Sequence, residues 1–302
     1  MESYTLYLAI HEFEKELEKE FALKGLNFEK RDRLYLVEGH HPPMIWAQAS
    51  GLRAQKIAIE SINDGARKLK ALQRNWALFT IENHRRAQLI QGELPKYNTK
   101  PIPFMKELPS TPMGLWTLWE PNLIVAAQET SSLFPLGEMT FEEDKINPPS
   151  RAYLKLWEFF TVHAPRNHHG GISIDVGSCP GGWTWVLSTL GYDVISVDKA
   201  PLDPKIAARK GVQFMEQSAF ALTPKDVPEL EWFCSDIICY PSRLLILVNQ
   251  FLDSGKVKNF ACTLKYQNET DWESTNRFLE IPGSKIVHLH HNKHEVTWFK
   301  IS

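Results

Sequence analysis

The stretch from Ile172 to Trp185, ISIDVGSCPGGWTW, constrains the fold of this chain more than any other. A short apolar run that carries Asp175 breaks into a glycine-rich turn between Gly177 and Gly182, and a helix-type sequence follows. This order of strand, tight turn and helix is typical of the first unit of a doubly wound α/β sheet, in which a ligand binds beyond the carboxyl ends of the strands. Glycines let the backbone approach a ligand closely, and the free N–H groups at the start of a helix face it.

Asp198 makes a ligand site at this turn the more specific interpretation. Glycine turns after strands are common, and an ordinary tight turn is the alternative. However, a second apolar run, residues 194–197, ends at Asp198. Because the carboxyl ends of parallel strands meet at one edge of a sheet, we expect this acid beside the glycine turn.

Composition and charge define the class of protein. With 302 residues, of which 43% are hydrophobic and 23% charged, we expect one large or two modest globular domains. No apolar run reaches the roughly 18 residues that a membrane span needs, and the start, MESYTLYLAI, lacks the cationic residues of a signal peptide. The four cysteines form no CxxC pair, which favours free thiols in a reducing cytosol. We therefore expect a cytoplasmic protein, with a monomer as the default.

A polar segment divides the chain. Residues 136–149, LGEMTFEEDKINPP, contain a double proline and are typical of a linker between a region 1–135 and a domain 150–302. The first region begins with strand, helix and strand signals at residues 4–10, 11–23 and 33–37, which suits a ferredoxin-like unit. Further along, residues 56–72 predict a helix, and apolar runs at 115–119 and 123–127 predict a hairpin.

Basic residues gather in the first region although the net charge of the chain is only −2. Between Gly51 and Ile90 there are eight Lys and Arg against three Asp and Glu. The eight, which we call the basic cluster, are Arg53, Lys56, Arg67, Lys68, Lys70, Arg74, Arg85 and Arg86. An RNA-docking face and a solvated helix surface remain equal alternatives for this cluster.

Helix and strand signals alternate throughout residues 150–302. Around the glycine turn, helices are predicted at residues 151–162, 204–210, 242–252 and 270–279, and strands at 212–215, 232–237, 258–264 and 286–290. A last strand, residues 296–301, follows so closely that we expect it to pair antiparallel. This pattern predicts a Rossmann-like class I methyltransferase sheet, parallel except for one strand in an edge hairpin. The turn lacks the GxGxxG spacing of a nicotinamide site, and we expect S-adenosylmethionine rather than a dinucleotide.

Four polar residues are expected to meet beside the turn. Asp236 and Lys265 each end a strand of the predicted sheet. Glu295 starts the final antiparallel strand, and Lys155 lies on the helix that leads into the domain. A lysine whose pKa is lowered by a neighbouring cation and by partial burial can act as a general base toward a sugar hydroxyl. Taken singly each residue is more often structural, but four at matching edge positions favour a catalytic group.

Six motifs of this domain resemble those of the FtsJ-like ribose 2′-O-methyltransferases. They are PPSRAYLKL, DVGSCPGGWTW, VISVD, CSDIICYP, TLKYQ and HEVTWF. The resemblance covers nearly all of residues 150–302 and is strongest to the RlmM type, which methylates a cytidine of large-subunit (23S) ribosomal RNA. It implies a catalytic Lys-Asp-Lys-Glu tetrad on Lys155, Asp236, Lys265 and Glu295, with Lys265 as the base.

The same resemblance implies how S-adenosylmethionine binds. In such folds the acid after the second strand holds the ribose hydroxyls, a position that Asp198 occupies here. The expected cofactor-binding residues are Ser150, Asp175, Gly177, Cys179, Pro180, Gly181, Gly182, Trp183, Asp198, Ser218 and Asp236.

This chain departs from the family pattern in two places. The family has an acid near the adenine after the third strand, where this chain has Ser218, with Glu216 two residues earlier. A serine can still hydrogen-bond the adenine amino group, and we expect weaker or rearranged binding rather than its loss. RlmM-type proteins also carry an RNA-binding THUMP domain, to which the middle of region 1–135 is similar only in a short, diverged form.

Two groups of side chains have competing interpretations. His288, His290, His291 and His294 lie within seven residues, but no Cys or acid completes a zinc spacing, and we expect no metal site. These imidazoles could equally stack on bases or contact phosphate. Trp183 and Trp185 are expected to pack inside the helix after the turn rather than to form platforms for bases.

The sequence thus predicts an RNA ribose 2′-O-methyltransferase that uses S-adenosylmethionine, with large-subunit ribosomal RNA as its partner and no membrane association. Within enzymes, the alternative is the same chemistry on transfer RNA or a messenger cap. Outside enzymes, the alternative is a non-catalytic RNA-binding protein on the methyltransferase fold. The four tetrad residues favour the enzyme, because nothing structural requires two lysines at a sheet edge.

Overall fold

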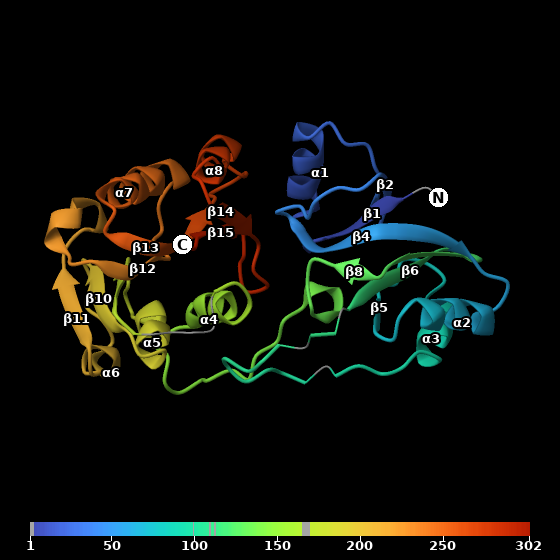
Figure 1. Ribbon diagram of the computed structural model, residues 1–302, viewed down its shortest axis with the longest axis horizontal. Helices are drawn as coiled ribbons and strands as arrows, with labels where there is room; N and C mark the ends of the chain where they lie inside the picture. The colour runs from blue at the N-terminus through green and yellow to red at the C-terminus, as the bar shows by residue number, and fades with distance from the viewer. Residues whose placement is uncertain (1–2, 99, 109, 112, 165–169) are drawn as a thin grey trace. The chain divides into compact units, whose positions relative to one another are not determined.

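The computed structural model divides the chain into two compact units, Met1–Phe141 and Glu142–Ser302. It describes residues 3–98, 100–108, 110–111, 113–164 and 170–302. Each unit has its own sheet and helices (Figure 1). Among the helices of the described residues, none is both long and apolar enough to cross a membrane.

The N-terminal unit is built on one eight-stranded sheet in the order β2-β3-β1-β4-β7-β6-β5, with β8 paired to β4. The strands are β1 (Tyr4–Ala9), β2 (Glu29–Arg31), β3 (Leu34–Glu38), β4 (Ala47–Ala58), β5 (Trp76–Leu78), β6 (Gly114–Glu120), β7 (Leu123–Ala127) and β8 (Glu129–Thr130). Strand β1 lies between β3 and β4 and is antiparallel to both. The predicted hairpin is confirmed, because β6 and β7 pair antiparallel.

Helices cover this sheet by burying aromatic and aliphatic side chains. Helix α1 (Glu14–Leu23) places the Phe21 ring 5.2 Å from the ring of Tyr7. Helices α2 (Ile62–Leu72) and α3 (His84–Gly92) pack over β5, β6 and β7, in a core that contains Leu69, Trp76 and Trp116. The apolar periodicity of these helices therefore reflects burial against the strands.

The prediction of a helix over residues 56–72 was wrong in its first part. Strand β4 runs to Ala58, and helix α2 begins only after Ser61, whose hydroxyl caps it by accepting a hydrogen bond from the Asp64 N–H at 3.1 Å. Strand β4 was not predicted because it is rich in small and polar residues. A Cβ on Gly51 would lie 2.7 Å from Cβ of Ala127, which shows how closely the chains approach there.

The C-terminal unit contains a seven-stranded sheet in the order β11-β10-β9-β12-β13-β15-β14. Its strands are β9 (Ile172–Val176), β10 (Asp193–Asp198), β11 (Val212–Glu216), β12 (Leu230–Ser235), β13 (Val257–Lys265), β14 (Ser284–Val287) and β15 (Glu295–Lys300). Strands β9 to β13 pair parallel, and β15 is antiparallel to both β13 and β14. The predicted doubly wound α/β sheet with one antiparallel strand in an edge hairpin is confirmed.

Helices pack on both faces of this sheet (Figure 1). One face carries α4 (Tyr153–Val162), α5 (Gly182–Thr189) and the short α6 (Pro204–Ala207), and the other carries α7 (Pro241–Ser254) and α8 (Trp272–Leu279). Helix α4 is buried nearly throughout, and its Phe160 ring lies 5.0 Å from the ring of Trp232 on β12. This burial on both faces explains why the strands read as continuous apolar runs.

Candidate active site

Strand register brings two acids to one edge of the C-terminal sheet. Val176, the last residue of β9, lies opposite Val197 of β10 on one side and Ser235 of β12 on the other. The next residues along these two neighbours are Asp198 and Asp236, which therefore flank the glycine turn that begins at Gly177. Residues that are far apart in the sequence thus form a single site at the carboxyl edge of the sheet.

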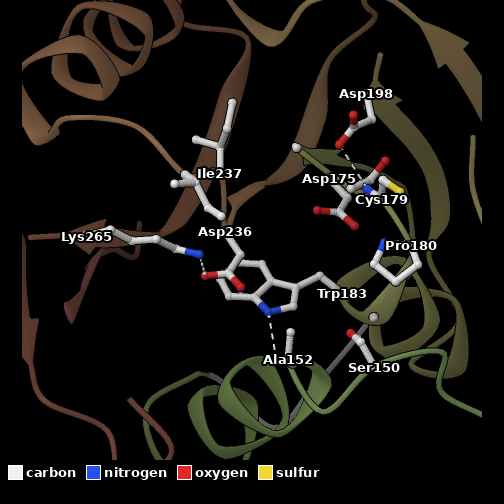
Figure 2. A pocket seen from close by; sticks show the side chains of 14 residues that line it. Ser150, Ala152, Asp175, Cys179, Pro180, Trp183, Asp198, Asp236, Ile237 and Lys265 are labelled. Atoms are coloured by element: carbon white, nitrogen blue, oxygen red, sulfur yellow. Dashed lines mark hydrogen bonds and ion pairs between the residues drawn. The ribbon is translucent and has the colours of Figure 1, made fainter. Parts of the chain in front are cut away.

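A cavity of about 380 Å³ opens at this edge (Figure 2). It lies within the size range of pockets that bind small ligands. Its walls come from the segment before α4, the glycine turn, the start of α5 and the ends of β10, β12 and β13. The residues that line it are Ser150, Ala152, Asp175, Gly177, Ser178, Cys179, Pro180, Gly182, Trp183, Asp198, Asp236, Ile237, Ile238 and Lys265.

Backbone hydrogen bonds and close packing fix the turn. The Cys179 N–H donates to Oδ2 of Asp198 at 3.0 Å, and the Gly177 N–H donates to the Val197 carbonyl at 2.8 Å. Gly177 has φ +80°, and a Cβ there would lie 2.8 Å from Cβ of Ile237. Only glycine fits this position, because it combines the left-handed backbone with the close approach of the loop after β12.

Three buried polar atoms at this cavity have no hydrogen-bond partner among the described residues. They are Oδ1 of Asp175, Oγ of Ser150 and Oγ of Ser178. The other Asp175 oxygen accepts a hydrogen bond from the Thr184 hydroxyl at 2.7 Å. Because buried polar groups are nearly always paired, these atoms indicate a polar ligand. A carboxylate and two hydroxyls suit the ammonium and carboxylate of an amino-acid moiety, such as the one that S-adenosylmethionine carries.

Asp175 is held in an unusual electrostatic state. Burial raises its pKa to about 7, with the carboxylates of Asp236 and Asp198 adding to the rise and the Thr184 hydroxyl opposing it. The side chain is only 1% exposed. A cationic ligand group beside Asp175 would favour its ionised form, because opposite charges stabilise each other in such a site.

The predicted tetrad residues lie together on the other side of the cavity. Nζ of Lys155 lies 2.6 and 2.7 Å from the two carboxylate oxygens of Asp236 and 2.9 Å from Oε1 of Glu295. Nζ of Lys265 lies 3.1 Å from Oδ1 of Asp236 and 4.0 Å from Oε2 of Glu295. Lys265 and Glu295 are also direct register partners on β13 and β15. Two lysines thus share two carboxylates.

The two lysines differ in what they face. Lys155 is 7% exposed and is not among the residues that line the cavity, whereas Lys265 is. Burial lowers the pKa of Lys155, but Asp236 and Glu295 outweigh this effect and raise it above the ordinary value. Lys155 therefore stays protonated at neutral pH, and Lys265 is the amine that a substrate in the cavity can reach (Figure 2).

A second cavity of about 240 Å³ adjoins the first. Gly177, Asp198 and Ile237 line both cavities. Ser218, predicted to lie near an adenine, lines the second one, where the Arg243 guanidinium lies 3.7 Å from the centre of the Phe220 ring. The two cavities thus adjoin at Asp198, which lines both of them.

The remaining predicted site residues are placed as follows. Cys179, Pro180 and Gly182 line the first cavity, and a Cβ on Gly182 would lie 2.8 Å from Oγ of Ser150. Gly181 does not line it, and its missing side chain makes room for Ile206, to which a Cβ would approach within 2.8 Å. Trp183 is 3% exposed and donates its indole N–H to the Ala152 carbonyl at 3.0 Å.

Sequence reasoning missed Glu158, an acid buried on α4. Its carboxylate accepts hydrogen bonds from the His290 N–H at 2.7 Å and from the N–H and Nδ1 of His291 at 3.0 and 2.6 Å. It thereby anchors the loop that leads into Glu295. An acid inside the apolar run YLKLWEFF was the available signal.

His288 makes a local contact at the start of this loop. Nε2 of His288 lies 2.9 Å from the Lys293 carbonyl, and burial lowers the pKa of His288 to about 4. Among the residues that the structure describes, no three His, Cys, Asp or Glu side chains are grouped so that they could hold a metal ion.

Comparison with known proteins confirms the resemblance of this unit. Residues 148–265 match the family model described as FtsJ-like methyltransferase. A protein of Halorhodospira halophila named ribosomal RNA large subunit methyltransferase M is 30% identical over 159 residues, which cover 50% of this chain and 46% of that protein. A protein of the same name from Pseudoalteromonas atlantica is 28% identical over 185 residues, which cover 55% of this chain and 51% of that protein.

The chain spans about half the length of these curated relatives. A solved structure described as a putative ribosomal RNA methyltransferase from Plasmodium falciparum is 15% identical, covers 51% of this chain and 97% of that chain, and superimposes with a TM-score of 0.39. The family-model match lies within the C-terminal unit, and the likeness to methyltransferases is therefore a likeness of this unit.

Proposed function

We propose that this protein is a cytoplasmic, monomeric RNA ribose 2′-O-methyltransferase. The observation that carries the proposal is the position of Lys265, which faces the cavity beside the glycine turn while two carboxylates and a second lysine surround its ammonium group. A hydroxyl group is weakly acidic, and an enzyme that uses it as a nucleophile needs a base within reach of its proton. Lys265 is the one tetrad amine that lines this cavity.

The tetrad divides the work between its members. Lys265, in its neutral amine form, accepts the proton of the ribose 2′-hydroxyl at Nζ and becomes an ammonium group. Asp236 and Glu295 hold both lysine side chains in position, and the protonated Lys155 offsets part of their negative charge. Bound S-adenosylmethionine supplies an electrophilic methyl group on a positively charged sulfur. The rest of catalysis is alignment of the hydroxyl oxygen with that methyl group.

The proposed cofactor contacts follow the two cavities. Asp175, Ser150 and Ser178 hold the amino-acid moiety, since their unpaired polar atoms are buried there. Asp198 binds the ribose hydroxyls through the oxygens that its hydrogen bond from Cys179 leaves accessible. Ser218 lies at the adenine end, beside Phe220 and Arg243. This assignment places cofactor contacts in both cavities.

We further propose large-subunit ribosomal RNA, at a cytidine, as the substrate. The names of the relatives from Halorhodospira halophila and Pseudoalteromonas atlantica support this choice over transfer RNA or a messenger cap. The N-terminal unit is then an RNA-binding region of ferredoxin-like and diverged THUMP-like character. Its strand order β2-β3-β1-β4, with α1 after β1, supports the ferredoxin-like assignment.

Part of the basic cluster is available for RNA. Arg67 and Lys70 on α2, Arg74 after it and Arg85 on α3 are exposed, and the two helices pack against each other. Arg67 and Lys68 both pair with Asp64, but the Arg67 side chain is 75% exposed, whereas Lys68 is only partly exposed and also donates to the Ala58 carbonyl. We therefore assign RNA docking to Arg67, Lys70, Arg74 and Arg85.

The proposal is tested by transferring radiolabelled methyl groups to total RNA from cells that lack this protein. The labelled RNA is fractionated by size and hydrolysed with alkali, because a 2′-O-methyl group protects the following phosphodiester bond. We expect alkali-resistant label in large-subunit RNA. Label in small RNA would contradict the proposed ribosomal substrate. No label in any RNA, with folding and cofactor binding intact, would contradict the proposed methyltransferase activity.

A further inference from the structure

The loop that follows β12 exposes two large apolar side chains beside the cavity. Ile238 is 84% exposed and Tyr240 is 59% exposed. Both belong to the segment Asp236–Tyr240, which we call the 236–240 loop. Single exposed apolar residues are ordinary on protein surfaces, but two of them in one loop at the mouth of a ligand cavity mark a contact surface.

This loop is fixed at both ends and is continuous with the tetrad. Asp236 contacts both lysines, and Ile237 packs against Gly177 of the turn. Ile238 lines the same cavity as Lys265. At the far end, the Tyr240 carbonyl accepts the first backbone hydrogen bonds of α7, from the N–H groups of Arg243 and Leu244. The two exposed side chains are therefore held in place by a rigid backbone.

The charges around the loop suit a polyanion. Burial raises the pKa of the Cys239 thiol, which lies between the two exposed residues, to about 11, and the cations of Arg243 and Lys265 oppose that rise. Both cations thus act on the centre of the loop. The Tyr240 side chain makes no hydrogen bond or ring contact with any residue that the structure describes, and the residue is more than half exposed.

We propose that Ile238 and Tyr240 form the platform on which the base of the target nucleotide stacks, an inference that rests on the proposed function. A base unstacked from its RNA neighbours binds well to aromatic rings, and such stacking tolerates any base. Its ribose would then reach Lys265, which lines the same cavity as Ile238. Ile238 and Tyr240 are thus substrate-positioning residues that fix one nucleotide at the tetrad.

The test compares kcat and KM of methyl transfer to RNA for three variants and a control. Removal of one stacking contact weakens binding of a base by an amount that corresponds to about 10- to 100-fold in kcat/KM. We expect this loss in Tyr240→Ala, a smaller loss in Ile238→Ser and near wild-type values in Tyr240→Phe, which keeps the ring. The control, Ile246→Ala, removes a side chain that is 63% exposed on α7 and lines none of the cavities described above.

Cofactor affinity, measured by calorimetry, is expected to be unchanged in the two Tyr240 variants and in the control. Ultraviolet crosslinking of RNA to the complex with S-adenosylhomocysteine should yield a crosslinked peptide that contains Tyr240. If Tyr240→Ala keeps the kcat/KM of the control and no crosslink falls in the 236–240 loop, the stacking role of Ile238 and Tyr240 is wrong, but the proposed methyltransferase function is unaffected. If the wild-type protein transfers no methyl group to RNA, the proposed function fails and the platform with it.

Discussion

The ammonium group of Lys155 lies 2.6 and 2.7 Å from the two oxygens of Asp236, and this same carboxylate reaches Lys265 at 3.1 Å. Asp236 thus bridges a buried lysine and a lysine at the cavity. The bridge fixes the position of Lys265 through side chains rather than through backbone alone. It also separates two roles, because one lysine holds the acids together and the other faces the substrate.

Replacement of Lys155 should destabilise the protein. In Lys155→Met, the carboxylates of Asp236 and Glu295 lose the largely buried cation that both contact. Breaking a buried ion pair from one side costs about 3–5 kcal/mol, which urea unfolding measures. Lys258→Met is the matched control, because Lys258 also pairs with a carboxylate but is exposed, and we expect little change. Equal stability of the two variants would contradict the bridging role of Lys155.

Asp175 should make the stability of the cofactor-free protein depend on pH. Its pKa is raised by burial from an ordinary value near 3.8 to about 7. Its contribution to stability is therefore fully present below about pH 4 and is lost as the pH rises through about 7. Asp175→Asn should remove this component from thermal unfolding curves recorded between pH 4 and 8. An unchanged pH profile in the variant would assign the dependence to other groups.

No other residue should replace Gly177, because of both its left-handed backbone conformation and its close contact with Ile237. Gly177→Ala forces a side chain into φ +80° and against Ile237. Gly191→Ala is a matched control, because Gly191 has φ +90° and a Cβ placed there would have no heavy atom within 4 Å. We expect Gly191→Ala to cost about 1 kcal/mol. Gly177→Ala should lose more stability than the control and most of its affinity for S-adenosylmethionine, as calorimetry would show.

Glu158 should support the tetrad from a distance. Glu158→Gln weakens the charge-assisted hydrogen bonds that the carboxylate receives from His290 and His291. We expect a loss of about 1–3 kcal/mol in the free energy of unfolding. Because the anchored loop leads into Glu295, kcat should fall while cofactor affinity stays constant. A variant with wild-type kcat would limit Glu158 to a structural role.

The C-terminal fold was predictable from sequence because its strands are buried on both faces. Runs such as residues 172–176 and 258–264 are apolar enough to be recognised as buried strands, and the glycine turn indicates which strand begins the sheet. The long strand β4 was not predicted, because its small residues around Gly51 are required by the close approach of neighbouring strands. This requirement comes from tertiary packing and cannot be inferred from the local sequence pattern.

The site shows the same division between local and long-range information. Asp198 and Asp236 follow apolar runs, and the register of parallel strands suffices to place them beside Gly177. The contact between Lys155 and Glu295 joins residues 140 positions apart, and it was expected from their positions in the predicted sheet and from the family resemblance. Glu158 was not predicted, because its partners on the histidine loop lie more than 130 residues away.

The central claim is that Lys265 is the base, and methyl transfer by Lys265→Ala tests it most directly. The variant is compared with wild-type protein and with Lys258→Ala, using RNA from cells that lack this protein, while calorimetry reports cofactor binding. We predict that Lys265→Ala loses about 10²- to 10⁴-fold in rate with cofactor affinity largely retained, and that Lys258→Ala keeps the wild-type rate. Wild-type transfer by Lys265→Ala would contradict the account.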